Sequence, residues 1–187
     1  SKTYHSKNFE MVVSARRGGS PKLKNMSYAI YNQSDQQEVK TGEKQSIGKD
    51  EENITTTISI PGEFQDGNYT VNATAWDEVG DGNSVKISRE FRVDTVKPEI
   101  SINSPENSTW QKENVDIGFS ITDDRSLKSC KRRHKDSETD WSKNTTFKCS
   151  KNTESFDTNN CIDSNSSKCI IEIIGVDSAG NTGTEKI

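Results

Sequence analysis

One phrase of the sequence is written twice, and this repeat limits the fold more than any other feature. Residues 73–84 read ATAWDEVGDGNS and residues 173–183 read IIGVDSAGNTG, so Asp77 and Asp177 hold equivalent places in the two copies. Their separation of about 100 residues is the period of a domain rather than of one turn in a solenoid. The chain of 187 residues is therefore predicted to contain two related domains.

Each copy of the phrase has the pattern of a β-hairpin. Apolar residues alternate with polar ones before each aspartate, which is typical of a strand with one buried face. Glycine and asparagine follow the aspartate, and these residues favour tight turns. A second strand then begins, in which Val85, Ile87, Phe91 and Val93 alternate in step. The residues on the apolar side of the first strands are Tyr69, Val71, Ala73 and Ala75, and then Cys169, Ile171, Ile173 and Gly175.

The remainder of each copy alternates in the same way. Phe9 to Ala15 and Val115 to Ile121 have the same spacing of apolar residues, and no segment of useful length has the period of a helix. Apolar residues make up 28% of the chain, which favours thin sandwiches over one thick core. Six or seven short strands in each copy predict an all-β protein with two tandem immunoglobulin-like β-sandwich domains.

The domains are predicted to be residues 1–95 and 96–187, joined through the connector DTVKP. Pro98 fixes its own backbone and disfavours helix in the residue before it, so the connector leads directly into the next strand. The predicted second domain carries all four cysteines.

The motifs at the ends of the domains resemble those of a known family. The opening D-x-x-x-P-x-I runs from Asp94 to Ile100, and the closing A-x-D-x-x-G-N hairpin runs from Ala75 to Asn83 and, less closely, from Gly175 to Asn181. This pattern is similar to that of the immunoglobulin-like modules repeated in tandem in archaeal and bacterial cell-surface proteins. The resemblance covers nearly the whole chain. It implies the fold, but these modules serve as spacers, adhesins and subunits of lattices or filaments alike.

The cysteines indicate an oxidising compartment. Cys130, Cys149, Cys161 and Cys169 lack the paired C-x2-C spacing of a zinc site, and an even number in a small hydrophilic β-domain predicts disulfides. Four cysteines allow three pairings, and the spacing does not choose among them. Related archaeal modules often bracket their central hairpin with two cysteines, so the resemblance implies Cys130 with Cys149 and Cys161 with Cys169.

Sequons for N-glycosylation also indicate a surface protein. The eight asparagines are Asn25, Asn32, Asn53, Asn68, Asn72, Asn107, Asn144 and Asn165. They are about twice as frequent as composition alone would give. Asn68 and Asn72 are predicted to face outward, because they alternate with the apolar residues of their strand.

The segment SLKSCKRRHKD holds the candidate binding residues Lys131, Arg132, Arg133, His134 and Lys135. Related modules usually carry aromatic and small residues here, and this chain departs from them after Cys130. One interpretation is a cationic knob that meets an acidic glycan, a phospholipid or the carboxylates of a neighbouring subunit. The interpretation favoured by the sequence is a solvated hairpin whose charges are offset by nearby acidic residues.

Several classes of function are disfavoured by the sequence. The formal net charge of −4 argues against a nucleic-acid or membrane-surface binder, and no apolar run approaches the length of a membrane span. With His5 and His134 as its only histidines, the chain offers no catalytic constellation, and we expect no enzymatic activity and no cofactor.

Calcium remains an open alternative. The carboxylates that turns or the connector could bring to a cation are those of Asp66, Asp81, Asp94, Glu99, Asp123 and Asp124. Their spacing matches no known calcium loop, so no metal site is assigned. Asp77 and Asp177 are assigned to the capping of turns.

The two ends of the chain differ from the repeat. The last strand of the second copy is about four residues shorter than that of the first, and SKTYHSK is a poor match to the strand that opens the second copy. Either the chain is cut from a longer protein, or a neighbouring subunit supplies a strand, as in some pili. In both cases a sheet edge would stay open at one end.

The sequence therefore predicts an extracellular, non-catalytic structural protein, a segment of a surface filament, S-layer or stalk. Its expected partners are neighbouring copies or domains of the same protein, with cell-surface glycan as a further candidate. Binding to nucleic acid is not expected, and attachment to a membrane is expected only through parts absent from this chain. The alternative is an adhesin or carbohydrate-binding module that presents loops or the basic hairpin to a ligand.

Overall fold

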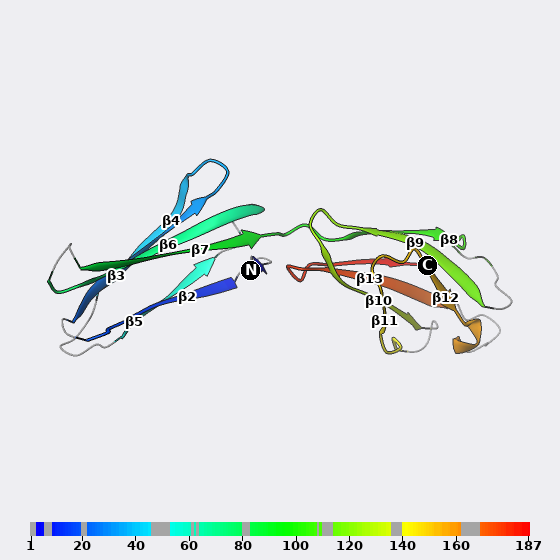
Figure 1. The fold of residues 1–187 in the computed structure, drawn as a ribbon. Helices are drawn as coiled ribbons and strands as arrows, with labels where there is room; N and C mark the ends of the chain where they lie inside the picture. Colours follow the sequence, from blue (N-terminus) through cyan, green and yellow to red (C-terminus); the bar gives the residue numbers. More distant parts are fainter. Residues whose placement is uncertain are drawn as a thin grey trace. The chain divides into compact units, whose positions relative to one another are not determined.

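The chain folds into two compact units that contain strands and turns. The structure is a computed structural model and describes residues 3–5, 9–19, 22–45, 53–60, 62, 64–79, 83–107, 109, 114–135, 140–161 and 169–187. Ser1–Thr95 forms unit 1 and Val96–Ile187 forms unit 2. Within the described residues the only helical element is one 3-10 turn, η1, at Thr158–Asn160, and none is long and apolar enough to cross a membrane. The fold is all-β, with two tandem immunoglobulin-like β-sandwiches (Figure 1).

The described residues of unit 1 form seven strands in two sheets. One sheet has five strands in the order β1-β7-β6-β3-β4, and the other has two, β2-β5. The strands are β1 (Thr3–His5), β2 (Phe9–Arg16), β3 (Leu23–Asn32), β4 (Glu38–Gln45), β5 (Asn53–Ile60), β6 (Gly67–Asp77) and β7 (Ser84–Val93). Among the described strands of unit 1, the only parallel pair is that of β1 with the last three residues of β7.

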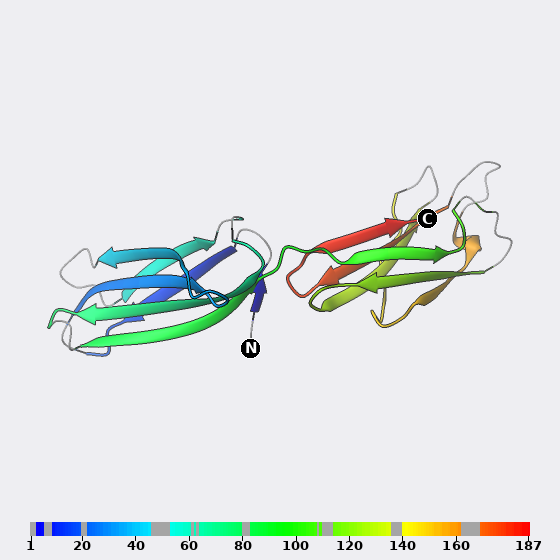
Figure 2. The ribbon, with the colours of Figure 1, turned by 90° about the horizontal axis from the view of Figure 1, so that it is seen from above.

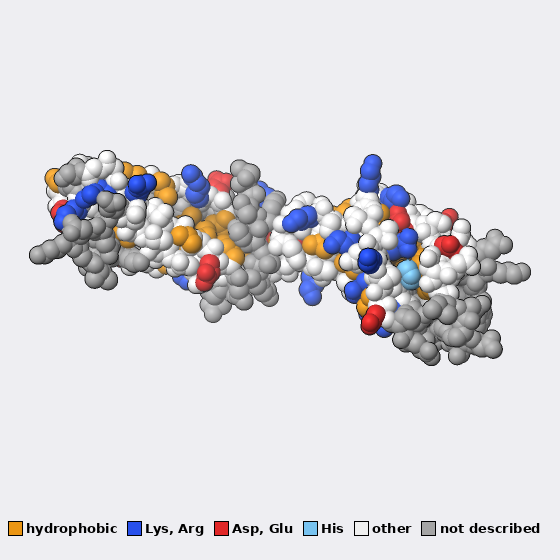
Figure 3. All heavy atoms as spheres, turned by 90° about the horizontal axis from the view of Figure 1, so that it is seen from below, with side chains coloured by type: hydrophobic (Ala, Val, Ile, Leu, Met, Phe, Trp, Pro, Cys, Tyr) orange, Lys and Arg blue, Asp and Glu red, His pale blue; other side chains and the backbone are white. Residues whose placement is uncertain are grey.

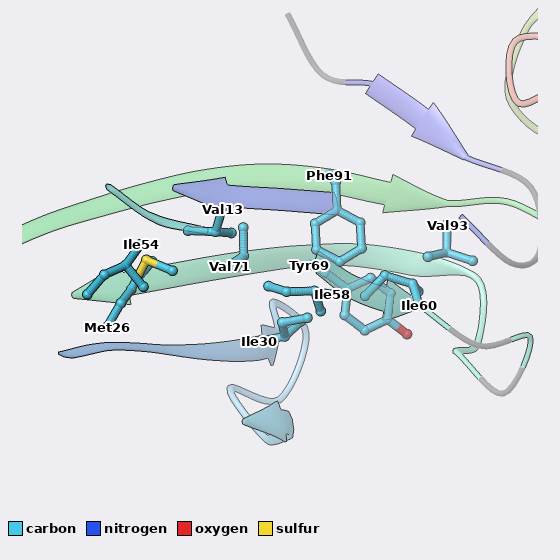
Figure 4. Close-up of a cluster of buried hydrophobic side chains, with 11 residues drawn as sticks. Val13, Met26, Ile30, Ile54, Ile58, Ile60, Tyr69, Val71, Phe91 and Val93 are labelled. Atoms are coloured by element: carbon cyan, nitrogen blue, oxygen red, sulfur yellow. The ribbon is translucent and has the colours of Figure 1, made fainter. Parts of the chain in front are cut away.

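The core of unit 1 lies between its two sheets, as Figure 4 shows. It consists of the alternate residues that the sequence pattern predicts on β6 and the matching residues of the facing strands. Tyr69 stacks on Phe91 with ring centroids 5.4 Å apart. Its hydroxyl donates to the backbone carbonyl of Gln65 at 2.8 Å, which is the tyrosine corner of immunoglobulin-like sandwiches. This bond fixes the turn through which the chain enters β6.

Unit 2 has the same strand order, with one strand placed differently. Its sheets are β11-β10-β13-β14 and β12-β9-β8. The strands are β8 (Glu99–Ser104), β9 (Val115–Thr122), β10 (Leu127–Lys135), β11 (Thr145–Phe147), β12 (Thr153–Phe156), β13 (Ile170–Asp177) and β14 (Thr182–Lys186). Among the described residues, the buried core cluster of unit 2 is small, with partly buried apolar residues packed around it, and its members are Ile117, Phe119, Phe156, Ile171 and Ile173.

Two disulfides lie in unit 2 and join the pairs that the resemblance implied. Cys130, which is fully buried on β10, is bonded to Cys149 in the turn after β11. Cys161 is bonded to Cys169, which directly precedes β13. Cys169 is the residue that the repeat matches to Tyr69, so a covalent bond holds the corner that a hydrogen bond holds in unit 1.

The two aspartates of the repeated phrase both cap turns, but to different degrees. Asp177 is 0% exposed, and its carboxylate accepts hydrogen bonds from the backbone N–H groups of Gly180 and Asn181 at 2.7 and 2.9 Å. It also accepts one from the side-chain amide of Asn181 at 2.8 Å. Asp77 is half-buried and accepts from the backbone N–H of Val79 at 2.9 Å.

This difference predicts unequal effects of the same substitution. Asp177→Ala is expected to lower the free energy of unfolding of unit 2 by about 2 kcal/mol, because two turn amides and the half-buried side-chain amide of Asn181 lose a buried acceptor. Asp77→Ala, which removes a more exposed acceptor, is expected to lower that of unit 1 by about 0.5 kcal/mol. Urea unfolding followed by hydrogen exchange within each unit measures both values, and equal losses would contradict the prediction.

Candidate binding surfaces

The five residues proposed for a cationic knob do not lie on one surface. They belong to β10, whose side chains alternate between the faces of its sheet. Arg132 and His134 pair in register with the core residues Ile173 and Ile171, and they face the interior. Arg133 and Lys135 face outward, as does Lys131, which pairs with Thr146 and Ile174. Figure 3 shows Lys and Arg side chains gathered over one side of unit 2.

The inward residue Arg132 is held in the sandwich by Phe156 and Glu154. Its guanidinium carbon lies 5.3 Å from the ring centroid of Phe156, within range of a cation–π interaction. Its Nε atom lies 3.9 Å from the carboxylate of Glu154, which is 9% exposed and also accepts from Lys151 at 2.7 Å. Arg132 is therefore the counter-ion of a buried carboxylate on the opposite sheet.

The inward residue His134 packs in the same layer. Its ring lies edge-on to Phe156 with centroids 5.1 Å apart, and its Nδ1 atom is 3.1 Å from the hydroxyl oxygen of Ser142. Burial, and to a lesser degree the charge of Arg132, lowers the pKa of His134 below the usual 6.5. The imidazole is therefore neutral at neutral pH, and it adds no charge to the segment.

The outward residues surround a tryptophan and a buried carboxylate that sequence reasoning did not identify. Arg133 is paired with Glu172, which is 3% exposed, and Lys186 lies 3.6 Å from the same carboxylate. The cationic groups of Arg133, Lys135 and Lys186 lie 4.4, 5.3 and 5.4 Å from the ring centroid of Trp141. These contacts give the outward cations a role within the sandwich. Binding by residues 131–135 stays a prediction.

The predicted sequons differ in accessibility. Asn25 is half-buried and donates to Glu43 at 2.7 Å, while Asn32 accepts from Ser34 at 2.9 Å. Asn68 and Asn72 lie on the outward side of β6, as its buried residues alternate with them. Asn165 lies outside the described residues. The sequon asparagines that are exposed are Asn53, Asn72, Asn107 and Asn144.

An open groove lies between the two sheets of unit 1. It has a volume of about 590 Å³ and is lined by β2 near Val13–Arg16, by β6 near Ala73–Asp77 and by the start of β7. Val85 and Ile87 were predicted to alternate in step with Phe91 and Val93. They share that face but are 69% and 45% exposed, because the two-stranded sheet does not extend over them.

The described residues do not form a metal centre. No group of three or more His, Cys, Asp or Glu residues among them is placed to hold an ion. Asp66 accepts from the backbone N–H of Thr95 at 2.8 Å, and Asp123 accepts from that of Arg125 at 3.1 Å, so these carboxylates stabilise loops. Asp81 lies outside the described residues.

Comparison with known proteins yields structural similarity alone. No family model matches the chain, and no curated protein matches it. The crystal structure of the FN1–FN3 domains of chicken CNTN1 is similar over 99% of this chain and 64% of its own length, with a TM-score of 0.45 and 11% identity. The tetra-tandem repeat in the extending region of a large adhesion protein is similar over 96% of this chain and 48% of its own, with a TM-score of 0.39 and 18% identity. The chain spans less than two thirds of each structure.

Proposed function

We propose that this chain is a non-catalytic extracellular structural protein, a segment of a surface filament, S-layer or stalk built of immunoglobulin-like repeats. The observation that carries the proposal is the pair of disulfides in unit 2, whose fully buried core cluster has five members among the described residues. Small domains with little core commonly depend on disulfides, and these persist in oxidising compartments. Tandem sandwiches of this kind supply length and surface rather than chemistry.

An adhesive role is the alternative, with the basic segment as the binding surface. The contacts of this segment inside unit 2 argue against that role. Arg132 and Arg133 are paired with the buried carboxylates of Glu154 and Glu172, and the neutral ring of His134 packs against Phe156. We therefore favour contacts between neighbouring copies or domains as the function of the surface, with exposed sequons such as Asn72 as attachment points for sugars.

The proposal is tested on intact cells of the source organism. Brief external proteolysis, followed by mass spectrometry without reduction, is expected to release the peptides of Cys130 and Cys149 as one linked species. Peptides that contain Asn72 are expected to carry a glycan mass. Cytosolic marker proteins, which must not be cleaved, are the control. Recovery of the chain from the cytosolic fraction with free thiols would refute the extracellular function.

A further inference from the structure

In unit 2, β8 occupies the space between the two sheets at their open edge. It pairs with β9 in one sheet and runs beside β14 of the other (Figure 2). Pro98 is buried just before β8, and Ile100 packs against the core. A Cβ atom on Gly175 would lie 3.3 Å from Cβ of Pro98 and 3.6 Å from Cδ1 of Ile100, so little space remains beneath the strand.

The matching place in unit 1 is open. Strands β2 and β7 correspond to β9 and β14, because Phe9 pairs with Ile60 as Val115 pairs with Phe156. In the part of unit 1 that the structure describes, β5 is the only strand paired with β2, and β1 pairs with β7 over Phe91–Val93 alone. The groove of about 590 Å³ lies between these edges. Among the described residues of unit 1, no strand therefore lies in the place that β8 takes in unit 2.

The walls of the groove have the character of a buried surface. Val85 and Ile87, two β-branched apolar residues, stand exposed on an edge strand, where the matching residues of unit 2 are Gly183 and Glu185. Soluble proteins usually protect such edges with charge or with a covering segment. An exposed edge with apolar side chains, beside a groove whose lining is both apolar and polar, is an arrangement that can accept an added strand.

We propose that this groove binds an extended strand from another polypeptide chain, in the place that β8 takes in unit 2. The backbone of the guest strand pairs with β2, and alternate apolar side chains enter the groove. The inference deepens the proposed function, on which it rests for the setting in which a partner chain is met. The partner is an extended segment in which apolar and polar residues alternate, as they do in β8.

The side chains of the groove define this partner further. Ala15 and Ala73 stand where unit 2 has Ile121 and Ile173, so the guest has room for apolar side chains larger than those of β8. Arg16 matches Thr122, the residue that pairs with Glu99. A guest with an acidic residue before its first apolar one would place that carboxylate opposite Arg16, where a cross-strand pair of opposite charges is favourable.

Because of Val85, the guest strand in unit 1 cannot follow the backbone path that β8 takes in unit 2. Gly183 lies so close to β8 that a Cβ atom on it would overlap the carbonyl oxygen of Pro98. Unit 1 has Val85 at this position, so the guest backbone cannot approach β7 as closely there. The guest therefore begins after the residue that corresponds to Pro98 and contacts Val85 with side chains.

The test uses the purified chain of 187 residues and three fluorescent peptides. The first has the sequence of residues 99–108, EISINSPENS, which omits Pro98. In the second peptide, phenylalanine replaces both Ile100 and Ile102. In the third, serine replaces both. Fluorescence anisotropy is expected to give binding of the first, binding about ten-fold tighter of the second, and none of the third.

Variants of the protein locate the binding. Val85→Lys with Ile87→Lys is expected to weaken binding of the phenylalanine peptide by about ten-fold or more, and these exposed positions leave the fold intact. Val39→Lys is the matched control, since Val39 is 42% exposed on β4 at the far edge of the same sheet. The affinity of the Val39→Lys variant for the phenylalanine peptide is expected to remain within about two-fold of the wild type, because Val39 lies outside the groove.

Two results would overturn the proposal. They are failure of the unmodified chain to bind the first two peptides, and binding that the lysine pair at 85 and 87 does not weaken. Self-association of the peptide-free chain that this pair abolishes, measured by sedimentation, would support the proposal, with a second copy as the source of the strand. Because purified protein is used, each result is independent of the cell-surface experiment, and failure of either proposal is recognised separately.

Discussion

Replacing Arg133 by methionine is expected to lower the free energy of unfolding of unit 2 by about 3 kcal/mol. Glu172, its ion-pair partner, is 3% exposed, while the other cation near the same carboxylate, Lys186, is 55% exposed and 3.6 Å away. Without Arg133 the buried charge keeps only a partner that is largely in solvent, so the loss of hydration is no longer offset. Removal of the guanidinium from the face of Trp141 adds to the loss.

Two further variants separate this pairing from a general effect of charge removal. Lys186→Met is expected to change stability by less than about 1 kcal/mol, because the ammonium group is exposed. The double variant Arg133→Met with Glu172→Met is expected to recover most of the loss, since apolar groups can replace a buried pair with little penalty. Urea unfolding, followed through hydrogen exchange of the β13 amides, reports unit 2 by itself. Equal effects of Arg133→Met and Lys186→Met would contradict the assignment.

The same contacts change how binding by the basic segment should be tested. Serine at both Arg132 and Arg133 would leave Glu154 and Glu172 without their guanidinium partners, so a loss of binding would follow from unfolding alone. Lys131 and Lys135 are better positions, because among the described residues the buried carboxylates Glu154 and Glu172 pair with other cations. A ligand that needs the charge of the segment would be lost in variants of these lysines while unit 2 stays folded.

Removal of the Cys130–Cys149 disulfide, by alanine at both positions, is expected to lower the stability of unit 2 by about 3 kcal/mol. The two cysteines are 19 residues apart, and opening a loop of that size restores freedom to the unfolded chain. For a unit of this size, the midpoint of thermal unfolding would fall by roughly 15 °C. Calorimetry of the wild type and the variant measures the shift.

Unit 1 supplies the internal control for this prediction, because it contains no cysteine. Its transition is expected to stay unchanged in the variant and under reducing conditions. Alanine at Cys161 and Cys169, which are 8 residues apart, is expected to lower stability by somewhat less, about 2.5 kcal/mol. A variant of Cys130 and Cys149 that unfolds at the temperature of the wild type would show that the packed residues alone hold unit 2.

The repeat and the alternation of residues were sufficient to predict the fold class. Tyr69, Val71 and Ala73 are buried in the predicted parity, and the phrase around Asp177 forms a capped hairpin. These features are local, since a strand with one buried face and a tight turn leave a period in the sequence itself. Such patterns report the elements and the face that each buries, but not which strands become neighbours.

The surfaces could not be predicted for the same reason. Arg132 and His134 occupy the inward places that Tyr28 and Ile30 occupy in unit 1, and only the facing residues Glu154 and Phe156 explain how they are accommodated. Alternation predicted burial of Val85 and Ile87, and they are exposed because no strand among the described residues covers that edge. Burial depends on the partner strand, and the partner lies far away in the sequence. The sequence indicated this open edge in one way: SKTYHSK is a poor match to the strand that opens the second copy.

The corner before β6 and β13 is closed by Tyr69 in one unit and by the Cys161–Cys169 bond in the other, and this difference has a consequence under tension. If the ends of the chain were pulled apart, unit 1 could extend over its whole length once its hydrogen bonds broke. In unit 2 the segments inside both disulfide loops would stay closed, which withholds roughly 90 Å of extension, at 3.3–3.6 Å for each residue. The two sandwiches, alike in fold, would act as a long and a short extensible element in series.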